Sequence, residues 1–262
     1  MNVKNPQTKI PFFKMVALGN DFIFLDKNYF FEARNHVGLI CDRRLGVGCD
    51  QLIVYLEDKQ KQAIYLDIIN NDGSRAEICG NAFRCTGDYF CKKNSWQAMD
   101  IIANNKTYSV EYKNNTSIVN MGKPLFKEIT INGVDLKHYY NPIYVNVGNP
   151  HVVLQAEYIN KEDVLSLGKI IENHKMFPKK TNVNFTKVID KKTVEIQTWE
   201  RGIGYSESCG SGATATFVAL FHSGLILNEA KVGGLNVFLK NEEVSIVGAT
   251  LFVFDGIYAI NI

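Results

Sequence analysis

The sequence has almost no excess of either charge, because 29 lysines and arginines face 27 aspartates and glutamates and leave a net charge of +2 over 262 residues. A balance this even argues against nucleic acid or an anionic membrane as the main partner. Long apolar runs are also missing. The longest, residues 212–221, has ten residues and includes two threonines, whereas a membrane span needs about 18. Residues 1–10 are polar and lack the apolar core of a signal peptide, so we expect a cytoplasmic protein.

The six cysteines contain no Cys-x-x-Cys pair, so the sequence predicts no metal site. In a cytoplasmic protein they should all be thiols. Hydrophobic residues make up 46% and charged residues 21% of the chain, which is ordinary for a folded protein and too apolar for a disordered one. The length predicts one large domain or two modest ones.

Several segments alternate apolar and polar residues, a pattern typical of half-buried strands. They are residues 144–147, 193–199, 237–239 and 244–247. Two other segments predict helices, at about 80–92 and 210–224. The second is apolar or small on nearly every face between Ala213 and Phe221, so it must be covered on all sides. Strands wrapped around this helix would cover it.

A weak internal repeat relates the two predicted helices. Gly19-Asn20 lies 60 residues before Cys79, and Gly148-Asn149 lies 61 residues before Cys209. Each cysteine is followed by glycine and a small polar residue, Cys79-Gly80-Asn81 and Cys209-Gly210-Ser211. Asn70 and Glu200 each stand nine residues upstream of their cysteine. Unless the similarity is due to chance, the chain is a duplication, with two similar domains meeting near 120–124, where glycine and proline interrupt the strands.

A cysteine at a helix N-terminus has unusual chemistry. The first N–H groups of a helix have no internal partner, and the peptide dipoles add partial positive charge, so the thiolate is favoured over the thiol. The same N–H groups bind a carboxylate, and a glycine after the cysteine lets the ligand approach the backbone closely.

Two such turns facing one another would place two bases on opposite sides of a single carboxylate. One thiolate could then remove an α-proton while the opposite thiol delivers a proton to the other face, with no pyridoxal phosphate or metal. Either cysteine alone would more simply be a small buried residue at a helix cap. The pair at equal spacing favours the catalytic interpretation.

The sequence resembles the diaminopimelate epimerase family, whose members are cofactor-independent amino-acid epimerases of lysine and peptidoglycan precursor synthesis. Eight matching segments occur in order along nearly the whole chain, at 14–22, 45–52, 70–74, 79–85, 148–151, 181–185, 200–202 and 209–213. One such motif would carry little weight, but eight in order are highly specific.

The resemblance implies a fold class, domain limits and site residues. The fold is α/β (α+β), with two pseudo-symmetric domains, each a curved mixed β-sheet around a central α-helix, and a site in the cleft between them. The domains would be 1–120 with 248–262, and 121–247. Cys79 and Cys209 would be the two acid/base residues, and His151 and Glu200 would adjust their pKa values. The residues implied to bind substrate are Asn20, Gln51, Asn70, Gly80, Asn81, Asn149, Asn182, Glu200, Arg201, Gly210 and Ser211.

Several of these roles have an independent physical basis. Diaminopimelate has an amino-acid group at each end, so its distal end needs donors for a carboxylate and acceptors for an ammonium. Arg201 can bind a carboxylate with two hydrogen bonds, and Glu200 can accept from an ammonium. The chain departs from the family pattern at Gly204-Tyr205-Ser206, at Val16-Ala17, at Ala82 and in an apparent N-terminal extension over residues 1–10.

Two alternatives to the epimerase remain. A related two-cysteine racemase could act on another amino acid, histidine or proline, but a substrate without a second carboxylate would leave the distal polar residues unsatisfied. An inert binding module on the same scaffold would need neither thiol. We therefore expect an isomerase with a small-molecule substrate, no cofactor, no nucleic-acid or membrane partner, and, by family precedent, a homodimer.

Overall fold

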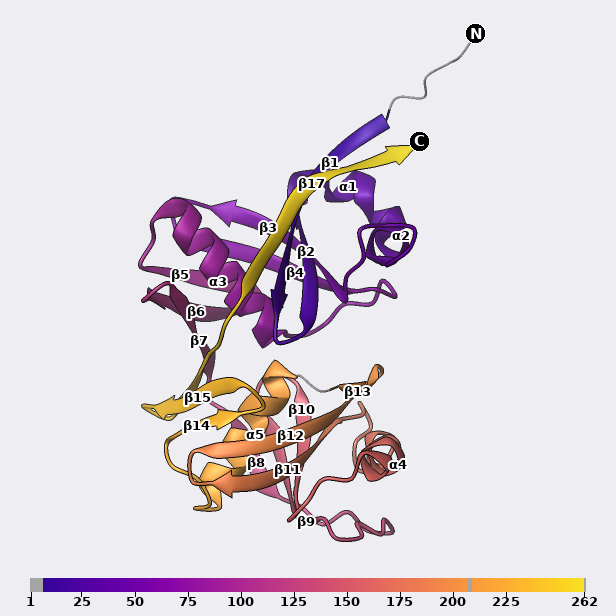
Figure 1. Cartoon of the computed structure of the whole chain (residues 1–262), viewed down its shortest axis with the longest axis vertical. Coiled ribbons are helices and arrows are strands. Elements are labelled where there is room, and N and C mark those ends of the chain that lie inside the picture. The colour runs from indigo at the N-terminus through magenta and orange to yellow at the C-terminus, as the bar shows by residue number, and fades with distance from the viewer. Residues whose placement is uncertain (1–6, 207–208, 262) are drawn as a thin grey trace. The chain divides into compact units, whose positions relative to one another are not determined.

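The computed structural model of the chain describes residues 7–206 and 209–261 (Figure 1). The chain divides into two compact units, Met1–Ser117 with Ala249–Ile262, and Ile118–Gly248. Residues 1–6, which begin the expected N-terminal extension, lie outside the described part. Residues 7–10 open the first strand, and Ile10 is buried in a hydrophobic cluster.

The first unit contains a mixed sheet in the order β17-β1-β2-β3-β4-β5-β6, in which β2–β3 and β4–β5 are parallel pairs. Figure 1 shows β17 in yellow beside β1, although these strands come from opposite ends of the chain. The strands are β1 (Gln7–Ala17), β2 (Asn20–Asp26), β3 (Gln51–Asp58), β4 (Ala63–Asn70), β5 (Ala98–Ala103), β6 (Lys106–Lys113) and β17 (Leu251–Asn261).

Helix α3 (Gly80–Asn94) packs on this sheet against β1, β5 and β6. The connection from β2 to β3 contains four short helical segments, whose apolar side chains join a buried cluster with β1, β2 and β3. These segments are η1 (Lys27–Tyr29), α1 (Phe30–Ala33), η2 (Arg34–His36) and α2 (Val37–Cys41).

The second unit has a mixed sheet in the order β8-β9-β10-β11-β12-β14-β15-β16-β7, with β13 also paired to β12. Its parallel pairs are β10–β11 and β12–β14. The strands are β7 (Thr116–Gly122), β8 (Leu125–Glu128), β9 (Tyr140–Asn146), β10 (Pro150–Gln155), β11 (Asn182–Asp190), β12 (Thr193–Glu200), β13 (Gly204–Ser206), β14 (Glu229–Val232), β15 (Leu235–Lys240) and β16 (Glu243–Val247).

Helix α5 (Gly210–His222) is the central helix of the second unit. Residues 210–220 are all buried, and strands β9, β10, β11, β12, β14, β15 and β16 contact it. The prediction that an all-round apolar helix needs cover on every side is therefore confirmed. Helix α4 (Lys161–Glu172) lies between β10 and β11 in the chain and packs its apolar face on β11 and β12.

The same succession of strand pairings occurs in both units. In the first unit, β2–β3 is parallel, β3–β4 antiparallel, β4–β5 parallel and β5–β6 antiparallel. In the second unit, β10, β11, β12, β14 and β15 repeat this series in the same order. The central helix follows the third strand in each series. The two halves therefore share one plan, as the internal repeat predicts.

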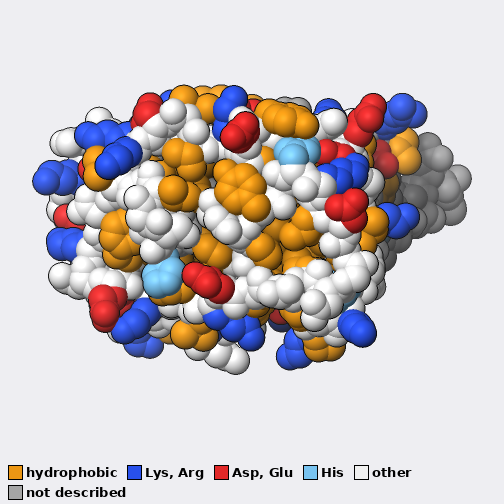
Figure 2. Space-filling model, turned by 90° about the horizontal axis from the view of Figure 1, so that it is seen from below, with side chains coloured by type: hydrophobic (Ala, Val, Ile, Leu, Met, Phe, Trp, Pro, Cys, Tyr) orange, Lys and Arg blue, Asp and Glu red, His pale blue; other side chains and the backbone are white. Residues whose placement is uncertain are grey.

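No helix in the described ranges is long and apolar enough to cross a membrane, and the longest, α3, has 15 residues. Figure 2 shows apolar side chains on one face, interrupted by polar atoms and by charged side chains of both signs. Scattered exposure of this kind is ordinary for folded proteins.

Candidate functional site

Cys79 stands immediately before the first helical residue of α3, with an extended backbone (φ −145°, ψ 101°). The residue is partly exposed, and Gly80 and Asn81 in the first helical turn are buried. This turn contains no acidic residue, so no carboxylate on it competes for the N–H groups at the start of the helix. The predicted position of the cysteine, at the start of a helix, is confirmed.

The side chain of Asn81 begins a chain of directed hydrogen bonds. Its amide Nδ2 donates to Oδ1 of Asn20 at 2.7 Å, and Nδ2 of Asn20 donates to Oδ2 of Asp50 at 3.3 Å. Because a carboxylate can only accept, Asp50 determines which way both amides face. Asn20 and Asn81, two predicted binding residues, are therefore held in one network.

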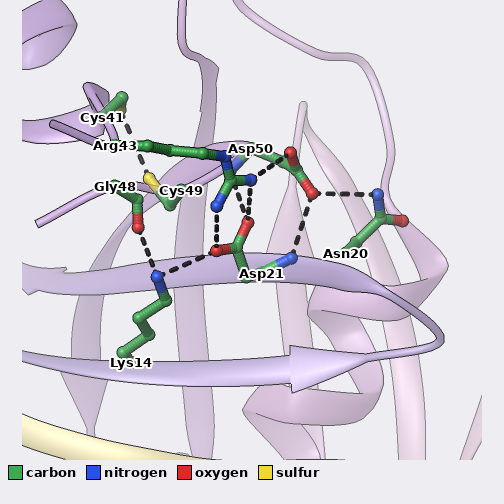
Figure 3. Close-up of polar contacts among 8 residues, drawn as sticks. All are labelled: Lys14, Asn20, Asp21, Cys41, Arg43, Gly48, Cys49 and Asp50. Carbon is green, nitrogen blue, oxygen red and sulfur yellow. Dashed lines mark hydrogen bonds and ion pairs between the residues drawn. The ribbon is translucent and has the colours of Figure 1, made fainter.

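A cluster of charged side chains holds Asp50, the acceptor at the end of this network (Figure 3). Arg43 donates to both oxygens of Asp21 at 2.8 Å and to Asp50 at 2.8 Å, and Nζ of Lys14 lies 2.9 Å from Asp21. Burial of Asp21 would raise the pKa of its carboxyl, but the hydrogen bonds from Arg43 and Lys14 outweigh burial and hold that pKa well below its usual range. The Asp21 carboxylate is thus ionised, and the cations of Arg43 and Lys14 lie against it.

Gln51 and Asn70 form a second pair in the first unit. They are opposite each other on β3 and β4, and Nε2 of Gln51 donates to Oδ1 of Asn70 at 2.9 Å. The amide of Asn70 in turn donates to the hydroxyl of Ser74 at 2.9 Å. Gln51 directly follows Asp50, so the pair adjoins the charged cluster at the end of the same strands.

Cys209 stands immediately before the first residue of α5, also with extended backbone (φ −121°, ψ 111°). Its Sγ accepts the N–H of Gly212 at 3.2 Å and lies 3.5 Å from the hydroxyl of Ser211. A Cβ at residue 212 would lie only 2.6 Å from Oδ1 of Asn184, so only glycine brings the helix this close to β11. Cys79 accepts no such capping bond from its own helix, so the two thiols have different surroundings.

The hydroxyl of Ser211 belongs to a buried polar group centred on His151. Nε2 of His151 lies 3.1 Å from Oγ of Ser211 and 3.0 Å from Oδ1 of Asn149, and the amide of Asn149 donates to Ser211 at 3.3 Å. On the other side of the ring, Nδ2 of Asn184 lies 3.1 Å from Nδ1.

These contacts assign the direction of every bond in the group. The hydroxyl of Thr198 donates to Oδ1 of Asn184 at 3.0 Å, so the amide nitrogen of Asn184 donates to Nδ1 of His151. A neutral imidazole that accepts at Nδ1 carries its proton on Nε2. His151 therefore donates toward Ser211, which leaves the hydroxyl hydrogen of Ser211 for the sulfur of Cys209.

His151 is neutral over the whole physiological range. Complete burial lowers its pKa from 6.5 to about 3, the hydrogen bond from Asn184 opposes this shift, and the charge of Arg201 adds to it. Below pH 6.5 the unfolded chain therefore binds one proton that the folded chain rejects, and stability falls as the pH falls toward 3.

We predict that urea unfolding between pH 6 and pH 4 detects the proton that His151 takes up when the chain unfolds. The wild type should lose about 1.4 kcal/mol of unfolding free energy per pH unit more than His151→Gln, which cannot titrate. The comparison of slopes removes the contribution of carboxylates shared by both proteins. Equal slopes in the two proteins would contradict a neutral, buried His151.

Asn182 and Arg201 are joined at the ends of β11 and β12. Oδ1 of Asn182 accepts the backbone N–H of Arg201 at 2.9 Å, and its Nδ2 donates to the carbonyl of Pro150 at 2.8 Å. The guanidinium of Arg201 donates to the carbonyl of Lys179 at 3.3 Å. Glu200 is the last residue of β12 and directly precedes Arg201, so these polar side chains share one end of the second sheet.

The predicted site residues divide between the units according to the repeat. The first unit contains Cys79 with Asn20, Gln51, Asn70, Gly80 and Asn81, and the second contains Cys209 with Asn149, His151, Asn182, Glu200, Arg201, Gly210 and Ser211. The sequence analysis missed Asp21, Asp50, Asn184 and Thr198. Asp21, Asp50 and Asn184 lie inside the matching segments, so the sequence marked their positions. It did not indicate which residues they would contact.

Tyr205, one of the departures from the family pattern, packs as a half-buried side chain against the hydrophobic cluster around α4. The ammonium of Lys161 lies 4.3 Å from the centre of its ring. Residues 207–208 lie outside the described part. Within the described part, no group of three or more His, Cys, Asp or Glu side chains could hold a metal ion.

Comparison with solved structures identifies the class of fold. A hydroxyproline epimerase from Agrobacterium vitis superposes with a TM-score of 0.72 over 97% of this chain and 92% of its own, at 10% identity. The chain therefore has the two-domain fold found in this epimerase, and the predicted fold class is confirmed.

Comparison of sequences identifies the family. The pattern of the diaminopimelate epimerase family matches residues 12–127 and 143–246. A diaminopimelate epimerase of Carboxydothermus hydrogenoformans is 34% identical over 94% of this chain and 98% of its own, and one of Methanococcus maripaludis is 33% identical over the same shares. The chain belongs to the diaminopimelate epimerase family and is an isomerase, as the sequence resemblance predicts.

Proposed function

We propose that the protein interconverts LL-2,6-diaminopimelate and meso-diaminopimelate by moving a proton at one α-carbon between two thiols, without pyridoxal phosphate. The observation that carries the proposal is the placement of Cys79 and Cys209, each directly before the buried central helix of a unit built on the same plan. Relatives at 33–34% identity over nearly the whole chain bear the corresponding name.

In the proposed mechanism, one cysteine acts as a thiolate and removes the α-proton, while the other acts as a thiol and protonates the opposite face. Exchange of these roles gives the reverse reaction. The α-carboxylate binds the N–H groups of Gly80-Asn81 and Gly210-Ser211, where the helix dipoles stabilise the charge that moves into it as the carbanion forms.

The surroundings of Cys209 suit both of its states. As a thiolate, its sulfur accepts the N–H of Gly212 and the hydroxyl of Ser211, and His151 orients that hydroxyl through its Nε2 proton. Because His151 is neutral, it directs a hydrogen bond without competing for the substrate proton. Glu200 is proposed to adjust the pKa of the other thiol, that of Cys79.

The remaining polar residues are proposed to bind the distal amino-acid group. Arg201 would hold the distal carboxylate with two hydrogen bonds, and Glu200 would accept from the distal ammonium. The amide side chains would supply donors and acceptors around them. These are Asn20, Gln51, Asn70, Asn149 and Asn182.

A substrate panel tests the proposed specificity. Purified protein is offered LL-diaminopimelate, L-histidine, L-proline and L-lysine, and the loss of optical purity is followed. We expect turnover of diaminopimelate alone, because the other substrates leave the guanidinium of Arg201 without a carboxylate. Equal turnover of histidine or proline would overturn the assignment of substrate.

The proposal extends to the domains and the cellular setting. We propose domains at 1–120 with 248–262, and at 121–247, close to the limits of the two compact units. We also propose that the enzyme works in the cytoplasm, with its small-molecule substrate and no nucleic-acid or membrane partner.

A homodimer is the remaining part of the proposal. Strand β17 leaves several large apolar side chains exposed, Leu251 at 61%, Phe252 at 45%, Phe254 at 41% and Ile257 at 64%. By their register with β1, Leu251 and Phe254 lie on one face of β17 and Phe252 and Ile257 on the other, so the strand exposes large apolar side chains on both faces, which favours cover by a partner.

Sedimentation velocity provides the check on assembly. We predict a dimer for the wild type at micromolar concentration and a monomer for the double variant Leu251→Lys with Ile257→Lys. The matched control is Phe31→Lys, which changes an equally exposed side chain on α1 (67%) and should leave the dimer intact. A wild type that sediments as a monomer would refute the proposal.

A further inference from the structure

Glu172, the last residue of α4, is a buried carboxylate with only 4% of its surface exposed. Its Oε2 accepts the indole N–H of Trp199 at 2.8 Å, and its Oε1 accepts the backbone N–H of Gly202 at 3.0 Å. Nζ of Lys180 lies 3.3 Å from the same Oε1. Both oxygens therefore have donors, which come from the segment before β11, from β12 and from the turn after β12.

The packing of α4 explains how this carboxylate reaches the sheet. The buried stripe of the helix includes Leu167 and Ile171, and Glu172 ends it. A Cβ at residue 168 would lie 2.5 Å from Cβ of Trp199, so only glycine brings α4 this close to β12. Because Glu172 follows Gly168 by one helical turn, its side chain reaches the indole nitrogen of the same tryptophan.

The carboxylate of Glu172 is ionised although it is buried. Burial would raise the pKa of this carboxyl, but the hydrogen bonds from Trp199, Gly202 and Lys180 outweigh burial and hold that pKa below its ordinary value. An ionised carboxylate can only accept hydrogen bonds. An apolar side chain of similar volume often replaces a buried ion with little loss of stability, so packing alone does not account for a carboxylate at this position.

The turn that Glu172 reaches carries Arg201. Strands β12 and β13 form a hairpin that contacts α4, and residues 201–203 are its tip. All three backbone N–H groups of the hairpin tip have acceptors, two of them side chains on other elements. These acceptors are Oδ1 of Asn182 for Arg201, Oε1 of Glu172 for Gly202, and the carbonyl of Glu200 for Ile203.

The surface position of the hairpin tip makes these bonds important. Gly202 is exposed, Ile203 is exposed by 67%, and a Cβ added at residue 202 would meet no atom within 4 Å. Packing against neighbours therefore restrains Gly202 little, and the bond to Glu172 supplies the restraint. A loose tip would leave the guanidinium of Arg201 free to adopt orientations that make one hydrogen bond to a carboxylate instead of two.

We propose that Glu172 fixes the hairpin tip and thereby orients the guanidinium of Arg201 toward the distal carboxylate of the substrate. It acts through Arg201 and is therefore a positioning residue. This role rests on the proposed function, which assigns the distal carboxylate to Arg201. Asn182 holds the N–H of Arg201 and Glu172 holds that of Gly202, so two successive peptide groups of the tip are fixed by different elements, β11 and α4.

The first test is amide hydrogen exchange at Gly202, measured by NMR on isotope-labelled full-length protein without substrate. Because Gly202 is exposed, slow exchange of its N–H requires the bond to Glu172. Glu172→Met should make this exchange several-fold faster. Glu172→Gln should keep much of the protection, because its amide oxygen can still accept. Exchange in the wild type at the rate of a free turn, or an unchanged rate in Glu172→Met, would overturn the proposal.

The second test compares KM and kcat for LL-diaminopimelate. Glu172→Met should raise KM about 10-fold and leave kcat within about two-fold, because a misplaced guanidinium weakens binding while both thiols are unchanged. Glu172→Gln should restore most of the KM. The matched control is Glu162→Met, the same change at an exposed residue of α4, which should keep a normal KM. An unchanged KM in folded Glu172→Met would overturn the proposal.

A double-variant cycle tests whether Glu172 acts through Arg201. In an Arg201→Ala background, Glu172→Met should change KM by less than about two-fold, because the guanidinium that it orients is gone. The same rise in both backgrounds would overturn the proposal. A wild type without epimerase activity would instead overturn the proposed function, and the exchange measurement, which requires no turnover, would still decide whether Glu172 holds the hairpin tip.

Discussion

Replacing Cys79 with serine is expected to lower kcat by about three orders of magnitude, with little change in KM. Cys209→Ser should do the same. A serine hydroxyl occupies the same place but is not ionised near neutral pH, so neither proton removal nor delivery at that face can proceed at the normal rate. Steady-state assay of LL-diaminopimelate epimerisation measures the effect, and circular dichroism verifies that each variant is folded.

Cys91→Ala serves as the matched control. It removes a buried thiol from the same helix, twelve residues after Cys79, and should keep near-normal activity while losing some stability. A Cys79→Ser enzyme as active as this control would show that the thiol at the start of α3 has no acid/base role.

The second large effect is expected at Arg201, where Arg201→Ala should lower kcat/KM by about 100-fold, mostly through KM. A guanidinium that makes two charged hydrogen bonds to a carboxylate contributes several kcal/mol to binding. Arg201→Lys should recover only part of the loss, because an ammonium lacks the planar pair of donors.

The matched control for Arg201 is Arg34→Ala, which removes an arginine that lies over the ring of Phe31 at 4.1 Å. We expect this variant to have normal kcat and KM. If Arg201→Ala also kept a normal KM, the distal carboxylate would have to bind elsewhere.

The two central helices and most strands could be predicted from the sequence because their signals are local. Cys79 and Cys209 each precede a glycine and a run of small or apolar residues, and both helices begin at that glycine. Strands β12, β15 and β16 cover three of the four alternating segments, and β9 covers the fourth except for Val147. The helix ends differ by about two residues from prediction, because the last turn depends on tertiary contacts.

The residues that hold the site in place could not be predicted in the same way. Asn184 is one residue of a matching motif, yet its importance comes from Thr198 on one side and His151 on the other. Asp50 likewise matters because Arg43 and Asn20 reach it from other segments. Such contacts join residues 7–33 positions apart, and neither composition nor periodicity encodes them.

The duplicated plan also explains why the two halves differ in chemistry. Both sheets deliver a cysteine to the start of a buried helix, but the residues of the following turn are free to diverge. In the second unit this turn supplies the N–H of Gly212 to the sulfur of Cys209, and in the first its Asn81 side chain donates to Asn20.

Epimerisation of LL-diaminopimelate in deuterium oxide tests the central claim, two thiols acting on opposite faces of one carbon, most directly. At low conversion the account predicts one deuterium at the inverted α-carbon of the meso product and almost none in recovered substrate, because each base exchanges with solvent on its own face. Deuterium entering recovered substrate as fast as product would indicate a single base and contradict the account.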